Sequence, residues 1–573
     1  MHSLKKQKMA LSEQEIIRRE KLSTLREMGI NPYPADLFPV NHTSKQVKEN
    51  FEVGKKVCLS GRLMSFRDQG KAGFGELQDS DGRIQLYFNR DMICLDEDKS
   101  LYNTVFKKLT DLGDFIGIEG ELFMTKVGAQ CVQVNDFKIL SKTLRPLPLP
   151  KTDDEGNVYD AFTDPELRYR MRYVDLVVNP QVKEVFVKRT KLFTAMRNFF
   201  NKAGYLEVET PVLQPIAGGA AARPFVTHHN SLDIPLYMRI ANELYLKRLI
   251  VGGFDGVYEF SKNFRNEGMD RTHNPEFTAM EIYVAYKDYN WMMTFTENLL
   301  ENCAIEVNDT TNTTFGEHEI DFKAPYARIT MTDSIKHFTG FDISGKSESE
   351  IFEAAKSMGI DVDETMGKGK LIDEIFGAKC ERNYIQPTFI TDYPIEMSPL
   401  CKQHRDNPEL TERFELMVCG KEIANAYSEL NDPIDQRERF EAQLALAARG
   451  DDEAGQFIDN DFLRALEYGM PPTSGLGIGM DRLIMYLTNN ASIQEVLFFP
   501  QMRPEKKQIE LTEDEKHIIE VLKANVGISI GDLKIKADLS GKKWDAASKG
   551  ISKLGLMKIV VDGDNKIVEY LGK

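Results

Sequence analysis

A polar loop between two strand-like runs, in residues 258–283 (YEFSKNFRNEGMDRTHNPEFTAMEIY), constrains the fold of this chain more than any other stretch. The runs at 258–260 and 278–283 alternate between two sets of side chains, as strands do. The loop carries charged and hydrogen-bonding groups and ends at an aromatic ring: Arg265, Glu267, Arg271, His273, Asn274 and Phe277. Arginine binds phosphate with two donors, and a flat ring can stack on a base. The pattern predicts a nucleotide-binding hairpin, although a solvated hairpin tip would share it.

Two further motifs flank this hairpin in the sequence. Residues 475–483 (GLGIGMDRL) set three glycines at alternate positions before Arg482 and an apolar helix, which allows close backbone approach to a ligand. Residues 199–211 (FFNKAGYLEVETP) read as the end of an amphipathic helix, stopped at Gly204, followed by a strand that Pro211 ends. The hairpin is therefore one of three candidate site elements.

In this order the three motifs resemble the signature motifs of class II aminoacyl-tRNA synthetases. The fuller text, FRNEG followed by HNPEF, NAYSELNDP and GLGIGMDR, resembles the lysyl-tRNA synthetase family over roughly residues 11–503. The resemblance implies an AMP-forming ligase that joins L-lysine to tRNA through a lysyl-adenylate, with ATP as substrate and Mg²⁺ as cofactor. It also implies a homodimer built on the first motif.

Composition limits the remaining function classes. The net charge of −16 argues against a protein that coats DNA, yet it permits local basic surfaces for tRNA. No run approaches the roughly 20 apolar residues of a membrane helix, and the N-terminus lacks the apolar core of a signal peptide. The seven cysteines are scattered without a C-x-x-C pair, which disfavours disulfides and zinc. We expect a cytoplasmic protein whose native start is Met9, with residues 1–8 an added leader or a tail.

The chain reads as an α+β protein with several domains, since 573 residues exceed one core. A helix and lead-in are expected over 1–50, with Ser12 and Glu15 in capping-box spacing. Short strands with glycine turns over 51–145 predict an OB-fold β-barrel. A proline-rich linker and one connecting helix fill 146–178. A class II catalytic domain, an antiparallel sheet flanked by helices, is expected over 179–503, with a helical insertion at about 290–397 to which no chemistry is assigned.

The last segment, 504–573, lies beyond the resemblance. Three helical patterns followed by a hairpin across residues 562–565 predict a winged-helix-like module. It holds 13 Lys and no Arg against 12 Asp and Glu, with Lys542, Lys543, Lys549 and Lys553 near the expected reading helix. The composition leaves three roles open: contact with tRNA, contact with another protein, or packing alone.

The resemblance assigns roles at the centre of the site. Arg265 would contact the α-phosphate and the amino-acid carboxylate, Arg482 the γ-phosphate, and Phe277 would stack on adenine. Glu267, His273 and Asn274 would complete the ATP contacts. Glu415 and Glu422 lie seven residues apart in two strand-like runs and would bind Mg²⁺, which prefers carboxylate and phosphate oxygens. Catalysis would rest on positioning and electrostatics, without a covalent nucleophile.

Charge favours lysine as the amino acid. An ammonium on an apolar stem needs carboxylates and aromatic walls, and the chain supplies Glu281 and Glu429, each two residues from a tyrosine and so on the same strand face. The residues expected to contact the amino acid are Gly219, Glu243, Arg265, Glu281, Tyr283, Asn425, Tyr427 and Glu429. One departure from the family is visible: Asn242 stands where A-P-E-L has proline, which puts the rigidity of that loop in doubt.

Three residues of the expected barrel would meet the anticodon by resemblance. Phe74 would stack on a base, Gln85 would hydrogen-bond one, and Arg67 would contact the loop. The alternative is that Phe74 is ordinary core, because alternating aromatics in strands usually face inward. Three rival functions remain open: an aspartyl- or asparaginyl-type ligase, a paralogue that lysylates a protein, and a non-catalytic RNA-binding protein on a synthetase scaffold. The first should carry a cation for its substrate side chain, the second should lack the barrel, and the third should lose Arg265 or Arg482.

Overall fold

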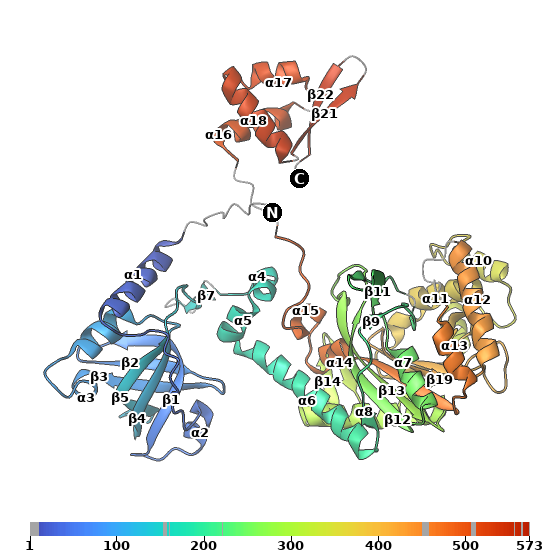
Figure 1. Ribbon diagram of the computed structural model, residues 1–573, viewed down its shortest axis with the longest axis horizontal. Helices are drawn as coiled ribbons and strands as arrows, with labels where there is room; N and C mark the ends of the chain where they lie inside the picture. The colour runs from blue at the N-terminus through green and yellow to red at the C-terminus, as the bar shows by residue number, and fades with distance from the viewer. Residues whose placement is uncertain are drawn as a thin grey trace. The chain divides into compact units, whose positions relative to one another are not determined.

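The computed structural model describes residues 11–152, 158–159, 161–220, 222–449, 458–505, 511–525, 527–554, 556–562 and 565–571 (Figure 1). It divides into two compact units, Met1–Gln501 and Met502–Lys573. The expected start at Met9 lies outside the described residues. Within the described residues, no helix is long and apolar enough to cross a lipid bilayer.

The N-terminal part of the first unit is a closed five-stranded barrel, which confirms the expected OB fold. Its strands follow the order β1-β2-β3-β5-β4 around the barrel. The bounds are β1 Lys56–Asp68, β2 Ala72–Gln78, β3 Arg83–Asn89, β4 Phe115–Met124 and β5 Gln130–Ser141. Helix α1 (Glu13–Glu27) precedes the barrel and starts with the expected capping box of Ser12 and Glu15. The other helices here are α2 Ser44–Glu49, α3 Arg90–Ile93 and η1 Leu101–Leu109.

The segment after the barrel differs from the expected single connecting helix. Two short strands, β6 (Lys151–Thr152) and β7 (Val158–Tyr159), pair with each other. The helical stretch is then broken at Met171, whose φ of −115° and ψ of 48° separate α4 (Pro165–Arg170) from α5 (Arg172–Val178). The break turns Arg172 inward, where its fully buried guanidinium pairs with Asp175 at 2.5 Å. The arginine is thus a structural anchor, which a pattern of charges along one helix could not reveal.

An eight-stranded mixed sheet organises the rest of the first unit, in the order β16-β17-β18-β19-β20-β13-β12-β8. The predicted hairpin is present as β12 (Gly256–Phe264) and β13 (Glu276–Ala285). The sheet is antiparallel inside, as expected, and it is parallel at both edges, where β16 pairs with β17 and β8 with β12. The other strands of this sheet are β8 Leu206–Glu207, β16 Ala327–Thr330, β17 Thr388–Thr391, β18 Arg413–Val418, β19 Lys421–Ser428 and β20 Thr473–Gly479.

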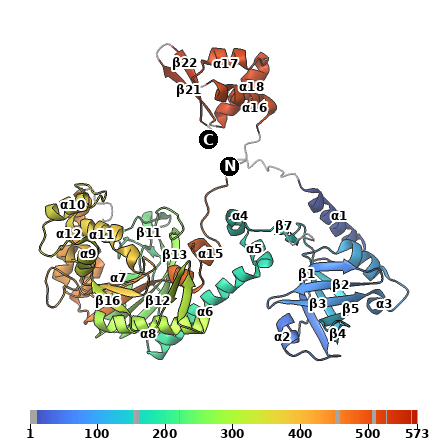
Figure 2. The same ribbon diagram turned by 180° about the vertical axis from the view of Figure 1, so that it is seen from behind.

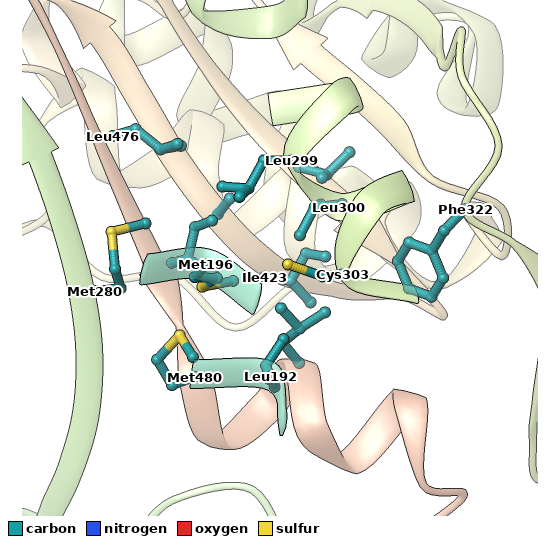
Figure 3. Packing of buried hydrophobic residues seen from close by; sticks show 14 of the residues in the cluster. Leu192, Met196, Met280, Leu299, Leu300, Cys303, Phe322, Ile423, Leu476 and Met480 are labelled. Carbon is teal, nitrogen blue, oxygen red and sulfur yellow. The ribbon is translucent and has the colours of Figure 1, made fainter. Parts of the chain in front are cut away.

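Alternation along the strands gives this sheet two different faces. Met280 and Ile282 of β13 point into the main core, where they meet Leu192 and Met196 of α6 (Pro180–Lys202) and the helices α8 (Tyr289–Asn308) and α14 (Met480–Leu487). Figure 3 shows Met280, Leu476 and Met480 beside these helices, and Figure 2 shows α6 and α8 on that side of the sheet. The odd-numbered residues of β13 therefore face the opposite side, which carries the candidate site.

The expected insertion is smaller than residues 290–397. Helix α8 belongs to the main core, and β16 and β17 belong to the sheet. A separate core holds only α9 (Met331–Thr339), α10 (Glu348–Ser357) and α11 (Lys368–Lys379) together with side chains from β17 and β18. Further elements of the unit are β9 Leu213–Gln214, β10 Val226–His229, β11 Ile234–Met238, α7 Glu243–Val251, β14 Asn312–Phe315, β15 His318–Asp321, η2 Glu381–Asn383, η3 Ile395–Met397, α12 Pro433–Arg449, α13 Asn460–Glu467 and α15 Ile493–Val496.

The second unit consists of three helices and a hairpin, in the expected order. The bounds are α16 Glu513–Ala524, α17 Ile530–Lys536, α18 Gly541–Lys553, β21 Met557–Asp562 and β22 Asn565–Tyr570. Thr512 and Glu515 form the expected capping box of α16. A separate small core centred on Ile518, Leu533 and Trp544 holds the unit together.

Candidate active site

Two rows of side chains cross the open face of the sheet. Strand register places Glu281, Gly477, Asn425 and Glu415 side by side on β13, β20, β19 and β18. The row two residues along holds Tyr283, Gly475, Tyr427 and Arg413. Because β20 contributes only glycine to both rows, the middle of this face carries no side chain and forms a floor between polar walls.

A cavity of about 1080 Å³ lies over this floor. It brings together most residues predicted to bind ATP and lysine. Those at its lining are Gly219, Glu243, Arg265, Glu267, His273, Asn274, Phe277, Glu281, Tyr283, Glu415, Glu422, Asn425, Tyr427 and Arg482. Glu429 is the one predicted residue of the two sets that does not line it; its carboxylate lies where a Cβ of residue 475 would stand.

Gly475 and Gly477 of the floor differ in the space that a side chain at each position would meet. A Cβ on Gly475 would lie 2.2 Å from Glu429 Oε1 and 2.5 Å from the Tyr283 ring, so this position must be glycine for the wall to close. A Cβ on Gly477 would meet nothing nearer than Glu281 Cγ at 3.7 Å. The space above Gly477 is therefore left open for a ligand, whereas the space at Gly475 is filled by the protein itself.

Three buried carboxylates surround one end of the cavity. Tyr283 donates to Glu281 Oε2 at 3.1 Å, and Tyr427 donates to Glu243 Oε1 at 2.7 Å. Burial, reinforced by the charge of Glu243, raises the pKa of Glu281 to about 8. Burial likewise raises the pKa of Glu429 well above its ordinary value, against the opposing effect of Lys247. Raised pKa values of two neighbouring carboxyl groups are typical of a functional site, and here they favour the binding of a cation.

Lys247 is the residue of this end that the sequence did not reveal. Its fully buried ammonium lies 2.6 Å from Glu243 Oε1 and also contacts Glu429. Burial opposes the charge, but the two carboxylates outweigh it and raise the pKa of Lys247 above its ordinary value. When Glu281 and Glu429 are both ionised, three carboxylates face one ammonium, so this end of the cavity then carries two negative charges that a bound cation can neutralise.

The departure from the family at Asn242 is compensated by hydrogen bonds. The side chain is fully buried and donates to Glu259 Oε2 at 2.8 Å, while Ser261 donates to its carbonyl oxygen at 3.4 Å. Glu259 in turn pairs with Arg239 at 2.7 Å. The start of α7, and with it Glu243, is therefore fixed by side-chain bonds where the family uses the rigid ring of proline.

The opposite end of the cavity carries the predicted phosphate-binding groups. Arg265 closes its loop through a backbone bond to the Pro275 carbonyl at 2.9 Å, and its guanidinium lies 5.1 Å from the Phe277 ring centroid. Arg265 Nε is buried without a hydrogen-bond partner among the described residues. Arg482 stands in the first turn of α14 and donates to the backbone carbonyl of Glu422. Among the described residues, the guanidinium of Arg265 contacts the Phe277 ring and that of Arg482 contacts the Glu422 carbonyl. Both guanidinium groups therefore keep N–H donors for an anion.

Three other predicted ATP contacts, His273, Asn274 and Glu267, lie in the same loop. His273 is exposed and lies 2.9 Å from Asp270, whose pKa is lowered by that contact and by Thr272 despite the opposing effect of burial. Asn274 donates to the Glu276 carbonyl at 2.6 Å and accepts from the Gln501 backbone at 3.2 Å. Asn274 therefore already shapes the loop, and Glu267 is exposed at its tip.

Two carboxylates stand together beside Arg413. Arg413 donates to Glu415 at 2.6 Å and to the Asn425 oxygen at 3.2 Å. Burial and the charge of Glu422 raise the pKa of Glu415 to about 8. The pair fits a hard divalent cation, because Mg²⁺ takes one or two carboxylates and completes its shell with phosphate and water. No cluster of three or more metal-ligating side chains occurs among the described residues.

The cavity also includes residues from the small helical core, which sequence reasoning left without chemistry. Residues 367–370 at the start of α11, with Glu348, Asp373 and Glu396, contribute to its lining. Lys368 pairs with Glu396 at 3.2 Å. Alternating helical patterns and polar loops gave no signal for this, since the position depends on how that core folds back over the sheet.

The barrel presents the three predicted anticodon residues on one face. Phe74 is half-buried and lies outside the barrel core, because Gly73, Gly75 and Leu77 take the inward positions of β2. Its ring lies 5.0 Å from Tyr87, which lies 5.7 Å from Phe123. Arg67 is the register partner of Phe74 and is exposed, and Gln85 keeps a buried oxygen without a hydrogen-bond partner. The face is an aromatic platform with polar edges, and Tyr87 and Phe123 extend it beyond the sequence prediction.

Comparison with known proteins agrees with this geometry. Residues 164–503 match the family described as tRNA synthetases class II (D, K and N), and residues 57–140 match the OB-fold nucleic acid binding domain. The barrel and the glycine-floored sheet are thus those of a class II aminoacyl-tRNA synthetase, the class to which the chain belongs.

Three similar proteins identify the family within this class. The chain is 74% identical to the lysine–tRNA ligase of Christiangramia forsetii over 97% of both chains, and 67% identical to that of Porphyromonas gingivalis over 87% of both. It is 63% identical to the lysine–tRNA ligase of Azobacteroides pseudotrichonymphae over 87% of this chain and 99% of that relative. Within its class, the chain belongs to the lysine–tRNA ligase family.

Proposed function

We propose that the chain joins L-lysine to ATP to form lysyl-adenylate and pyrophosphate, and then transfers the lysyl group to tRNA. The observation that carries this proposal is the set of three buried carboxylates, Glu243, Glu281 and Glu429, around the one ammonium of Lys247, a set with an excess of two negative charges when all three are ionised. Lysine brings an α-ammonium and a side-chain ammonium, so it neutralises that excess. An aspartyl- or asparaginyl-type substrate offers one ammonium at most and leaves a buried carboxylate uncompensated.

The lysine would lie along the two rows of the sheet. Its α-ammonium would face Glu243 and the backbone of Gly219, and its carboxylate would face Asn425 and Arg265. Its side chain would pass between Tyr283 and Tyr427 to end at Glu281, and Glu429 would contribute charge from its position over Gly475. Aromatic walls suit both the apolar stem and the ammonium of lysine.

Arg265 would then stand where the two substrates meet. A lysine carboxylate oxygen attacks the α-phosphorus of ATP, a new phosphorus–oxygen bond forms, and the bond to pyrophosphate breaks. Arg265 neutralises the charge that develops between these anions. Its Nε has no hydrogen-bond partner among the described residues and can donate to them. Phe277 would stack on adenine, Arg482 would bind the γ-phosphate, and the remaining ATP contacts would come from Glu267, His273 and Asn274.

Glu415 and Glu422 would hold Mg²⁺ against the ATP phosphates. The raised pKa of Glu415 beside Glu422 supports this, because two neighbouring half-buried carboxylates favour a cation beyond Arg413. When bound, the metal supplies charge neutralisation for the phosphates. Arg413 would orient Glu415 and Asn425 at the same time, since it donates to both.

Pyrophosphate exchange with each of the twenty amino acids tests the proposal. We expect exchange with lysine and none above background with aspartate or asparagine. Exchange with another amino acid would mean that the charge argument is wrong. Silence with all twenty would favour the non-catalytic scaffold, against which the intact Arg265 and Arg482 already speak.

A homodimer through the first motif is part of the proposal. Apolar side chains are exposed on α6 and on the strands that follow it: Val187 (49% exposed), Leu206 (49%), Leu213 (48%) and Val226 (63%). Exposed apolar groups on successive elements favour an interface when they form one patch. Light scattering at micromolar concentration should give twice the chain mass of 65.3 kDa, and Val187→Glu should shift it toward the monomer.

The barrel would bind the tRNA anticodon through Phe74, Gln85 and Arg67. The half-exposed aromatic platform and the unpaired oxygen of Gln85 support base stacking with one polar contact. A barrel with this face also disfavours a paralogue that lysylates a protein. The seven free cysteines, six of them buried, fit a reducing compartment, so we place the activity in the cytoplasm.

A further inference from the structure

The second unit has the element order of a winged helix. Ser529 forms a β-bridge with Ile567, and the Val568 backbone donates to the Ile528 carbonyl at 2.9 Å, so a short strand between α16 and α17 joins the β21–β22 hairpin. The order is thus helix, strand, helix, helix and hairpin. The four residues 537–540 join α17 to α18, which is the spacing of a helix-turn-helix.

Helix α18 is seated firmly on the core of this unit. Trp544, Ala547 and Ile551 are its buried residues and recur on one side of the helix. A Cβ on Gly550 would lie 2.0 Å from Glu515 Oε1, so this glycine allows close contact with α16. In a helix-turn-helix the second helix presents its outer face to nucleic acid. The outer face of α18 therefore corresponds to the face that a helix-turn-helix presents to nucleic acid.

Three lysines lie at the centre of that outer face, with the exposed Asp545 at its edge. At 100° per residue, Lys542, Lys549 and Lys553 fall within about 40° of one another and opposite the buried side. All three are exposed. Lys543 points elsewhere and pairs with Asp514 at 3.7 Å, but no ion pair joins the other three to any residue that the structure describes in this unit. We call Lys542, Lys549 and Lys553 the lysine stripe.

The charge of the unit is polarised around this stripe. The first turn of α16 gathers Glu513, Asp514 and Glu515, on the helix that packs against the buried side of α18. Residues 504–573 carry 13 Lys against 12 Asp and Glu, whereas the whole chain has a net charge of −16. Like charges at 549 and 553 repel across one helical turn. A stripe without partners on an acidic protein is suited to a polyanion.

We propose that the lysine stripe of α18 contacts the phosphate backbone of tRNA. The choice of tRNA rests on the proposed function, which makes tRNA the nucleic acid that this chain engages. A-form RNA has a deep, narrow major groove that side chains cannot read, so the contacts would be to phosphates and would add affinity rather than sequence specificity. The anticodon face of the barrel would supply the specific contacts.

The test measures binding of transcribed tRNA to the full-length protein as a function of salt. The variant Lys549→Ala/Lys553→Ala removes two stripe charges and keeps a good helix former at both positions. The control Lys516→Ala/Lys523→Ala makes the same charge change on α16. We expect the slope of log K against log salt to fall by about 1.5 for the stripe variant, and affinity to fall about tenfold at about 0.15 M salt. The control should keep the wild-type slope.

Three outcomes would overturn the proposal. They are an unchanged slope in the stripe variant, an equal loss in the control, and tighter binding of the wild type to a DNA duplex of matched length than to tRNA. Lysine-dependent pyrophosphate exchange needs no tRNA, so it separates the two proposals. Normal exchange with an unchanged slope refutes the stripe alone, and absent exchange in the wild type refutes the proposed function alone. Circular dichroism of the variant checks that α18 remains folded.

Discussion

Lysine affinity should depend on pH through Glu281, whose pKa in the ligand-free chain lies at about 8. The causes are burial first and the charge of Glu243 second. Below pH 8 the empty pocket therefore holds a proton on this carboxyl, and the incoming ammonium must displace it. Each pH unit below 8 costs about 1.4 kcal/mol, so the Kd for lysine should rise about tenfold per unit as pH falls from 8 to 6.

Three neighbouring groups, Lys247, Tyr283 and Glu429, also have shifted pKa values. Lys247 stays charged in this window, because Glu243 and Glu429 raise its pKa despite burial. The pKa of Tyr283 is raised well above its ordinary value by burial and then by Glu243. Glu429 also has a raised pKa, so the wild type can release more than one proton. The difference between wild type and Glu281→Gln isolates the contribution of Glu281.

Titration calorimetry in two buffers of different ionisation enthalpy measures the released protons. At pH 7 the wild type should release about one proton more per lysine than Glu281→Gln, because a group of pKa about 8 is mostly protonated at that pH. The variant should bind lysine weakly and bind ATP as the wild type does. Equal proton release in the two proteins, or a Kd that is flat between pH 6 and 8, would refute the reasoning.

The same substitution should stabilise the ligand-free protein. A carboxyl whose pKa rises on folding, from 4.5 to about 8, destabilises the fold above pH 4.5, and the cost grows until pH 8. At pH 7 that cost reaches about 3 kcal/mol at most. Glutamine can still accept the hydrogen bond from Tyr283, so Glu281→Gln should unfold at higher denaturant concentration at pH 7, with the gain vanishing near pH 4. A loss of stability at pH 7 would contradict the assigned burial cost.

Three further perturbations follow from the same geometry. Lys247→Met should lower the free energy of unfolding by about 3–5 kcal/mol, measured by urea denaturation, because two buried carboxylates lose their ammonium; Lys247→Arg serves as the charge-retaining comparison. Gly475→Ala should destabilise the chain, since its Cβ would lie 2.2 Å from Glu429 Oε1, whereas Gly477→Ala should fold normally and raise the KM for lysine or ATP in pyrophosphate exchange. Phe74→Ala should weaken tRNA binding by about 1–3 kcal/mol through lost stacking and leave pyrophosphate exchange unchanged.

The sequence predicted the parts of the site that depend on strand periodicity. The spacing of two between Glu281 and Tyr283 placed both on one face, and the structure joins them by a hydrogen bond of 3.1 Å. The alternating glycines of β20 predicted an open floor for the same reason. These inferences held because a strand fixes the direction of every second side chain without help from the rest of the fold.

The residues that the sequence missed depend on tertiary packing. Lys247 lies in an amphipathic helix, where a lysine is ordinarily solvated, and only the approach of β19 and its neighbours encloses it with Glu429. The break at Met171 and the inward turn of Arg172 likewise follow from a buried pair with Asp175. Tyr87 joins the platform because β3 lies beside β2, a register that local patterns leave unspecified.

The two faces of the sheet link stability and function in the same strands. In β13, Met280 and Ile282 build the core while Glu281 and Tyr283 build the pocket, so one element must satisfy both. The core side stabilises the fold, and the pocket side holds buried carboxylates whose negative charge a bound cation compensates. The strand therefore tolerates buried carboxylates because its apolar side is packed by α6 and α8. Weakening that packing, for example at Met280, should reduce lysine binding as well as stability, although Met280 itself lies on the face away from the pocket.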